Sequence, residues 1–301
     1  MIASLANLNA ARRFRHGLAL LVSLLLVSCA TTPHPLQERV WHTGEQRFIS
    51  DDELVASMAD SHYILLGEIH GERAHHAFQA ALIDALARHG RRPVVAMEMI
   101  DSTQAGVLHD YLDSGEATAD GLAEVLRWED SGWPDWSLYQ TVVEAALRHQ
   151  LPLAAANRPR HEVREVARQG LAMLDADERA ELGLDQPLPT TAVSELERRL
   201  RDAHAGHISE DRLPAMLDAQ RLRDAYMALR IRQADRGDGV ILITGNAHAS
   251  KLYGVPWYLH QAGENSTFSL GQVPVSPGDK TPADYPQHFD ALRFTSPRRR
   301  P

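Results

Sequence analysis

Two copies of one short pattern, a glycine that ends an apolar run and is followed three residues later by a histidine, lie far apart in this 301-residue sequence. The first copy runs from Gly67 to His70 and the second from Gly245 to His248. Glycine lets the backbone turn sharply or approach a ligand closely, and the histidine can then point back over the turn. Neutral imidazole is a common metal ligand and a base near neutral pH. The pattern therefore indicates acid–base or metal chemistry.

Apolar runs precede both patterns and recur twice more. The four runs cover residues 63–67, 93–97, 151–156 and 240–245. Short continuous runs of this kind are typical of parallel strands that are buried on both faces. Helical periodicity at residues 74–88 and 137–149 alternates with them. The sequence therefore predicts an α/β fold with a mainly parallel central sheet flanked by helices.

Polar side chains follow all four runs. In chain order they are Glu68, His70, Glu98, Asn157, Arg158, Asn246 and His248. Open parallel sheets bind ligands at the carboxyl ends of their strands, so we expect these residues to line one cleft. His75 and His76 follow the first loop by about one helical turn, and one of them can face the same cleft. Each residue alone also has a structural explanation, such as helix capping by Glu68 or loop support by Asn157.

Two kinds of chemistry fit this set of residues. His70, Glu98 and His248 could together hold a divalent metal ion. They could also activate water directly, with Glu68 and Arg158 assisting, in a hydrolase that acts on esters or peptides. The sequence has no Gly-x-Ser-x-Gly motif, so a serine hydrolase of that type is not favoured.

The third quarter of the chain departs from the alternation of strands and helices. Residues 160–236 are rich in Arg, Glu, Ala and Leu and contain no strand-like run, which predicts an inserted helical subdomain of two or three helices. One long helix is expected at about residues 214–234. Residues 266–270 are predicted to add an edge strand. Residues 276–301 form a Pro- and Arg-rich segment that we expect to be a poorly ordered tail.

The N-terminus has the layout of a targeting segment. Residues 1–28 contain arginines, no acidic residue and an apolar run that is shorter than the roughly 20 residues needed to cross a bilayer. This layout predicts a signal peptide. The segment ends at Cys29, the only cysteine, in a sequence that resembles a bacterial lipobox. We therefore expect lipidation of Cys29, a tether over residues 29–40 and a folded domain over residues 41–275. A buried core cysteine after an ordinary signal peptide is the alternative.

Composition excludes several other classes. With 44% apolar and 24% charged residues, the chain suits one or two globular domains. Its formal charge of −9 argues against nucleic acid as a partner, because nucleic-acid binding relies on a basic surface. A single cysteine excludes a disulfide framework. The sequence has neither a Walker A motif nor a GxGxxG pattern, which argues against a nucleotide-dependent role.

Further motifs carry a resemblance to a known family. They are Leu65-Leu66-Gly67-Glu68-Ile69-His70, His75-His76-x-x-Gln79, Ala96-Met97-Glu98-Met99, Trp136-x-x-Tyr139, Ala156-Asn157-Arg158, Gln220-x-x-x-Asp224-x-x-Met227-Ala228, Gly245-Asn246-Ala247-His248 and Gly254-Val255-Pro256. In this order, over residues 40–275, they resemble the ChaN family of haem-binding lipoproteins. The paired glycine–histidine patterns with Glu98 between them also resemble the wider superfamily of Tiki metalloproteases, TraB-like proteins and erythromycin esterases.

The resemblance implies a cofactor, partners and a location. It implies haem, with its iron, bound by a tyrosine at the interface of a homodimer, and a role in haem or iron uptake. It implies anchoring to the outer membrane through the lipid on Cys29, at the periplasmic face or the cell surface, with an outer-membrane haem or iron receptor as a partner. Tyr226, Tyr253 and Tyr258 are the candidate haem ligands. Trp128, Trp133, Trp136 and Tyr139 could wall a flat apolar ligand or belong to the core.

Three functions therefore stay open from the sequence. The first is a haem-binding lipoprotein. The second is a metal-dependent or acid–base hydrolase that uses His70, Glu98 and His248. The third is a partner-binding lipoprotein with a degenerate site, whose partner surface would be the helical segment at residues 160–236. Kinship of fold does not decide among them.

Overall fold

A computed structural model describes residues 34–203 and 209–297 of the chain. The predicted signal peptide, Cys29 and the first part of the tether lie outside the described residues. Within them, no helix combines the length and the apolar character that crossing a membrane would require. From Leu36 onward the chain forms one structural unit.

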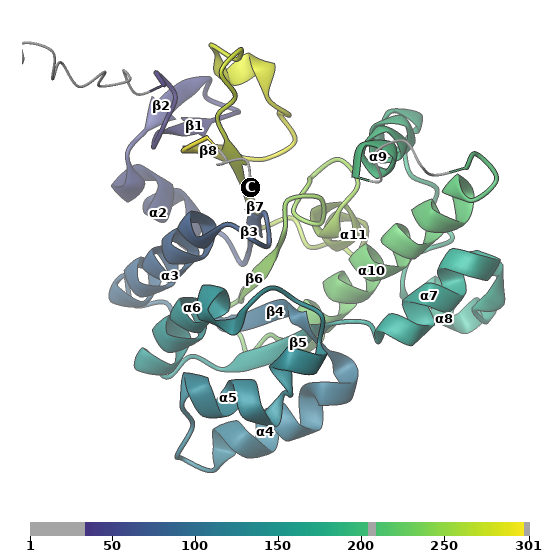
Figure 1. Cartoon of the computed structure of the whole chain (residues 1–301), viewed down its shortest axis with the longest axis horizontal. Coiled ribbons are helices and arrows are strands. Elements are labelled where there is room, and N and C mark those ends of the chain that lie inside the picture. Colours follow the sequence, from purple (N-terminus) through teal and green to yellow (C-terminus); the bar gives the residue numbers. More distant parts are fainter. Residues whose placement is uncertain (1–33, 204–208, 298–301) are drawn as a thin grey trace, which may run out of the picture. The chain divides into compact units, whose positions relative to one another are not determined.

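An eight-stranded sheet forms the centre of that unit (Figure 1). Its strands are β1 (Val40–His42), β2 (Arg47–Ile49), β3 (Tyr63–Glu68), β4 (Val94–Asp101), β5 (Leu153–Asn157), β6 (Val240–Gly245), β7 (Thr267–Pro274) and β8 (Ala291–Thr295). Their order in the sheet is β2-β1-β8-β7-β3-β6-β4-β5. All neighbours from β8 to β5 pair in parallel, and β1 pairs antiparallel with β2 and β8. The four apolar runs are β3 to β6, so the predicted fold class is confirmed.

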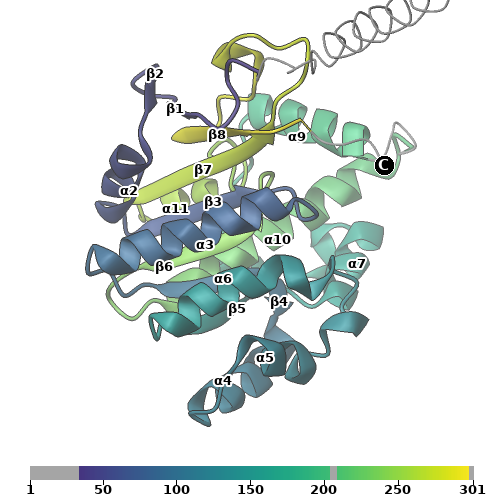
Figure 2. The ribbon, with the colours of Figure 1, turned by 60° about the vertical axis from the view of Figure 1, so that its left-hand side comes forward.

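Helices cover both faces of this sheet (Figures 1 and 2). The α-helices are α2 (Asp51–Ala59), α3 (Arg73–Arg88), α4 (Ala105–Asp113), α5 (Ala119–Val125), α6 (Trp136–Arg148), α7 (Arg160–Gln169), α8 (Ala176–Glu181), α9 (Thr190–Ala203), α10 (Leu213–Ala234) and α11 (Val255–Gln261). Short 3₁₀ segments are η1 (Ser102–Gln104), η2 (Trp128–Asp130), η3 (Leu171–Met173) and η4 (Pro282–Asp284). Figure 2 shows α3 and α6 lying along one face of the sheet.

Alternate residues of the central strands feed two separate cores. Ile64 and Leu66 of β3 point into the core under α2, α3 and α6, whereas Leu65 points into the core under α10 and α11. Side chains alternate between faces along a strand, so a strand covered on both faces must be apolar at every position. This is why these strands appear in the sequence as unbroken apolar runs.

The helical segment at residues 160–236 packs directly on the sheet. Its described part contains four α-helices, α7 to α10, where we expected two or three. The long helix α10 contacts β5, β4 and β6 as well as α7. The segment therefore supplies one of the two helical layers that cover the sheet.

Two expectations about the C-terminal part of the chain were wrong. The predicted edge strand is β7, which lies inside the sheet between β3 and β8. Residues 276–301 are not wholly a poorly ordered tail, because Ala291–Thr295 form β8. Leu292 and Phe294 of β8 are fully buried. This short strand was not predicted because it follows a proline-rich loop. The end of the predicted tether is also folded, since Leu36 is buried and Val40 begins β1.

Candidate functional site

The carboxyl ends of β3, β6, β4 and β5 lie side by side at one edge of the sheet, and Glu98 stands at their centre. Its side chain is 1% exposed. One carboxylate oxygen, Oε2, accepts hydrogen bonds from Thr244 Oγ1 at 2.6 Å and from the Gly245 amide at 2.8 Å. The other, Oε1, accepts from the Arg223 guanidinium. Burial alone would raise the pKa of Glu98, but the nearby His248, Arg223 and His70 hold it far below its usual value.

His248 lies between two buried carboxylates. Its Nε2 is 3.4 Å from Glu98 Oε1, and its Nδ1 is 2.5 Å from Asp224 Oδ1. Gln220 Nε2 also lies 2.9 Å from the same Nδ1. Asp224 is completely buried, and this burial raises its pKa in spite of the neighbouring His248. A carboxylate behind an imidazole fixes the ring's orientation and selects its tautomer.

His70 occupies the matching position on the other side of Glu98. Its Nε2 is 3.8 Å from Glu98 Oε1, and its Nδ1 is 2.8 Å from Glu68 Oε1. Burial lowers the pKa of His70, but the two carboxylates outweigh it, and the pKa is raised. Tyr139 donates its hydroxyl proton to Glu68 Oε1 at 3.1 Å, and His76 Nε2 lies 3.1 Å from Glu68 Oε2.

The side chains around Glu98 form a row in which carboxylates and imidazoles alternate. It runs from Asp224 through His248, Glu98 and His70 to Glu68. We call these five residues the Glu98 cluster. The His70 side chain is 32% exposed, against 5% for His248, so His70 is the member that a ligand in the cleft meets. The arrangement suits general acid–base chemistry, because a proton on His70 can be exchanged with a carboxylate on either side.

The geometry gives no support to a metal ion at His70, Glu98 and His248. In the part of the chain that the structure describes, no group of three or more His, Cys, Asp or Glu residues is arranged to hold a metal. The physical reason is the Arg223 guanidinium, which is paired with Glu98 Oε1 on the side that a cation would approach. The structure thus places the charge of an arginine where we expected that of a metal.

The other strand-end residues support the site from behind. Asn157 Nδ2 donates to the Glu98 carbonyl at 2.9 Å, and its Oδ1 accepts from the Arg158 amide at 3.0 Å. Asn246 binds the backbone of Gln272 with both ends of its amide. The Arg158 guanidinium is paired with Glu162 and Glu178. Arg158 therefore does not face the Glu98 cluster, contrary to the assisting role that we expected for it.

His75 lies outside the cleft and is buried against β8. Its Nδ1 accepts the Ile69 amide proton at 2.9 Å, and its Nε2 is 3.2 Å from Thr295 Oγ1. This geometry suits a neutral ring that donates from Nε2. Burial lowers the pKa of His75 from 6.5 to about 4. The neutral ring therefore helps to fix the loop that carries His70.

The low pKa of His75 predicts acid sensitivity. The unfolded chain binds a proton near pH 6.5 and the folded chain only near pH 4, so stability is complete above pH 6.5 and falls as the pH drops toward 4. The expected loss is about 3 kcal/mol of unfolding free energy. His75→Gln should flatten this fall in urea unfolding curves recorded at successive pH values, whereas the exposed control His89→Gln should not. Equal pH dependence in all three proteins would contradict the prediction.

Two of the three candidate haem tyrosines are buried and hydrogen-bonded to arginines. Tyr253 is fully buried and its hydroxyl oxygen accepts from Arg199 at 3.1 Å. Tyr258 is 3% exposed and its oxygen accepts from Arg221 at 3.4 Å. Burial raises the pKa of both phenols. Tyr226 is only partly buried, with the Arg158 guanidinium 5.4 Å from its ring centroid.

The predicted aromatic set is partly core. Tyr139 and Trp128 are buried and their ring centroids are 5.1 Å apart. Trp128 also contacts Trp136, and these two line a groove of about 870 Å³ together with Trp133. Trp133 in addition contacts His70, with 4.9 Å between the ring centroids. The buried rings therefore form core, and Trp133 contacts His70, while a wall for a flat apolar ligand stays a prediction.

Sequence reasoning missed three members of the site. Thr244 and Arg223 bind Glu98, and Asp224 binds His248. A signal for two of them exists in the sequence. Gln220, Arg223 and Asp224 are spaced by three and four residues, so they share one face of α10, although this helix lies in a buried layer. A polar face on a buried helix indicates that polar side chains of the sheet lie opposite it and pair with it.

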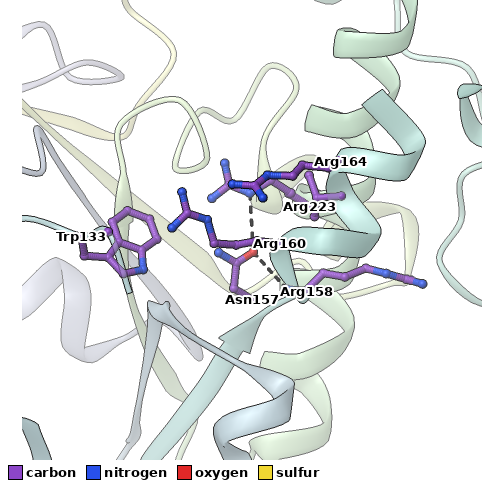
Figure 3. Close-up of a pocket in the computed structure, with 8 residues that line it drawn as sticks. Trp133, Asn157, Arg158, Arg160, Arg164 and Arg223 are labelled. Carbon is purple, nitrogen blue, oxygen red and sulfur yellow. Dashed lines mark hydrogen bonds between the residues drawn. The ribbon is translucent and has the colours of Figure 1, made fainter. Parts of the chain in front are cut away.

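A cavity opens beside the Glu98 cluster, at the amino end of α7 (Figure 3). Its volume is about 230 Å³. It is lined by Gly132, Trp133, Asn157, Arg158, Arg160, Val163, Arg164 and Arg223. An adjoining space of about 530 Å³ shares Trp133, Asn157, Arg160 and Arg164 and reaches Glu98. Of the residues that we expected to line one cleft, Asn157 and Arg158 line this cavity and Glu98 lines the adjoining space, whereas Glu68, His70, Asn246 and His248 line neither.

The chain is similar to known proteins in family and in fold. The family model described as haem-binding uptake, Tiki superfamily, ChaN matches residues 54–259. The solved structure "Cofacial heme binding to ChaN of Campylobacter jejuni" is 22% identical, covers 86% of this chain and 98% of that one, and has a TM-score of 0.68, which shows a shared fold. The type III effector HopBA1 is 13% identical over 82% of this chain and 93% of its own, with a TM-score of 0.48. An erythromycin esterase mutant is 19% identical over 81% of each chain, with a TM-score of 0.43. No curated protein gives a significant sequence match.

Proposed function

The chain belongs to the haem-binding uptake family of the Tiki superfamily, ChaN, and from this membership we propose that it binds haem in haem or iron uptake. The observation that carries the proposal is the match of the family model, which extends over residues 54–259 and so includes both glycine–histidine patterns. The related protein of Campylobacter jejuni is described as binding haem cofacially. We propose a cofacial arrangement here too, in a homodimer.

We also propose where this haem binding takes place. The lipobox-like sequence before Cys29 supports a lipid anchor on that residue and attachment to the outer membrane, at the periplasmic face or the cell surface. A protein held there can pass haem to or from an outer-membrane haem or iron receptor. This receptor is the proposed protein partner.

Among the three candidate ligands, accessibility favours Tyr226. The phenols of Tyr253 and Tyr258 are buried and hydrogen-bonded to arginines, and burial raises their pKa values. They are therefore poorly placed to lose their protons and bind an iron atom at the surface. Tyr226 is partly exposed on α10. Tyrosine as an axial ligand of haem favours ferric iron, so we propose ferric haem on Tyr226.

A hemin titration followed through the Soret band tests this proposal. Wild-type protein should bind saturably, and Tyr226→Phe should bind at least about tenfold more weakly because it removes the iron ligand. Tyr253→Phe and Tyr258→Phe are the matched controls and should bind within about twofold of wild type. The absence of saturable binding by the wild type would overturn the haem proposal. Loss of binding in a control variant instead of Tyr226→Phe would overturn only the choice of ligand.

The Glu98 cluster supports a second candidate, an acid–base hydrolase. The specific observation is the alternation of carboxylates and imidazoles around a partly exposed His70. In that function His70 would take a proton from water, and Glu98 and Glu68 would stabilise the resulting imidazolium. His70→Ala separates the two candidates. It should leave hemin binding unchanged if haem is bound through Tyr226, and it should abolish any ester or peptide hydrolysis that the cluster performs.

A further inference from the structure

The cavity beside the Glu98 cluster gathers positive charge that its own walls do not neutralise. Arg160, Arg164 and Arg223 all line it. Arg223 is paired with Glu98, whereas neither Arg160 nor Arg164 forms an ion pair with any residue in the described ranges. Figure 3 shows Arg158 directed away from the other three arginines, consistent with its pairing to Glu162 and Glu178. Two uncompensated guanidinium groups therefore remain beside the cavity.

Arg160 and Arg164 lie on one side of the cavity, and a local contact holds Arg160 there. Arg160 and Arg164 are four residues apart on α7, so they are neighbours on the same face of the helix. Arg160 Nη1 donates to the Ser131 carbonyl. Gly132 has φ of 75°, and a Cβ there would lie 2.8 Å from Arg160 Nη1. The positive φ favours glycine at this position, and the Ser131 carbonyl holds the Arg160 guanidinium at the edge of the cavity.

Arg160 and Arg164 are both exposed and their like charges repel each other weakly, so an anion bound between them would be stabilised by both. The adjoining space is lined by Glu98, which is paired with Arg223, and by Asp101 and Asp130, neither of which forms an ion pair with Arg160 or Arg164 in the described residues. Asp101 accepts from the Thr103 amide at 2.9 Å, and Asp130 is paired with Arg127 at 2.5 Å. Guanidinium forks match the oxygens of phosphate and carboxylate, and the amino end of α7 adds the favourable end of a helix dipole.

We propose that this cavity binds the phosphate group of a small phosphate monoester, at a site separate from the haem. Two uncompensated positive charges match a phosphate dianion, whereas a carboxylate would leave one charge unmatched. A volume of about 230 Å³ suits a small ligand. Trp133 lines both the cavity and the adjoining space and contacts His70, so a planar group bound through its phosphate packs on the indole and lies next to the Glu98 cluster.

Isothermal titration of the purified protein with phenyl phosphate, in a Tris chloride buffer, tests this proposal. The wild type should bind, and the double variant Arg160→Gln, Arg164→Gln should bind at least about tenfold more weakly. Arg168→Gln lies one turn further along α7, removes an exposed arginine that does not line the cavity and should stay within about twofold of wild type. Benzoate should bind at least about tenfold more weakly than phenyl phosphate. Binding should weaken in high salt, because Arg160 and Arg164 are exposed.

Several outcomes would overturn the proposal. They are failure of the wild type to bind phenyl phosphate at millimolar concentrations, undiminished binding by the double variant, and binding of benzoate as tight as that of phenyl phosphate. A hemin titration of the double variant distinguishes this site from the haem site. Hemin binding at wild-type strength supports a separate site. Its loss together with that of phenyl phosphate would assign the arginines to the haem propionates and overturn the proposal. An unchanged midpoint of thermal unfolding shows that the double variant is folded.

Discussion

Replacing Glu98 with alanine will lower the free energy of unfolding by roughly 3 to 5 kcal/mol, the range seen when one partner of a buried ion pair is removed. The carboxylate neutralises the Arg223 guanidinium and faces the Nε2 atoms of His70 and His248. Without it, the hydroxyl proton of Thr244 and the amide proton of Gly245 also lose their acceptor. Urea unfolding followed by far-ultraviolet circular dichroism measures the loss.

Two further variants show whether the loss comes from the buried cluster. Glu210→Ala removes an exposed carboxylate paired with Arg201 and should leave the free energy of unfolding close to that of the wild type. Glu98→Gln preserves the shape of the side chain but removes its charge. Because the Glu98 charge raises the pKa of His70, this variant should lower the His70 pKa, which NMR titration of the ring can follow. If Glu98→Ala proved as stable as Glu210→Ala, the central role of Glu98 would be contradicted.

The sequence predicted β3 to β6, misplaced β7 within the sheet and missed β1, β2 and β8, for physical reasons. Strands β3 to β6 are covered on both faces, so burial selects apolar residues at nearly every position. The strands β1 and β2 have three residues each, too few to establish a pattern. The position of β7 depends on how the chain crosses over after α11. That crossover is a tertiary feature, so residues 266–270 were placed wrongly at the edge of the sheet.

The same limit applies to the site. Parallel strands bring their carboxyl ends to one edge, so the proximity of His70, Glu98 and His248 follows from recognising the strands. Their chemistry does not follow from this, because it depends on what approaches from α10. Arg223 reaches Glu98 from a helix more than a hundred residues later in the chain. Arg223 lies outside every strand-end motif, so the strand-end motifs alone do not show that a guanidinium lies beside Glu98.

Replacing Asp224 with leucine will reduce the free energy of unfolding by about 3 kcal/mol, because the change leaves a buried imidazole without its partner. Asp224 Oδ1 is 2.5 Å from His248 Nδ1, and the His248 side chain is only 5% exposed. The measurement is again urea unfolding. If removal of the partner is the cause, the loss should shrink when His248 is also replaced.

A double-mutant cycle tests this coupling. Asp224→Leu together with His248→Phe should be more stable, by about 1 to 3 kcal/mol, than the sum of the two single losses predicts. The exposed pair Asp113 and His109, 3.4 Å apart on α4, provides the matched control, and its coupling should stay below about 0.5 kcal/mol. If the two losses of unfolding free energy simply added, Asp224 and His248 would contribute to stability independently of each other.

A large coupling would also explain the polar face of α10. Hydrophobic contacts alone hold a helix on a sheet without fixing its rotation or register, since apolar side chains pack in many similar ways. Asp224 on His248 and Arg223 on Glu98 are directional contacts that only one register satisfies. By binding two neighbouring strand ends, α10 sets the distance of 3.4 Å between His248 Nε2 and Glu98 Oε1. The stability of the fold and the geometry of the site would then depend on the same two contacts.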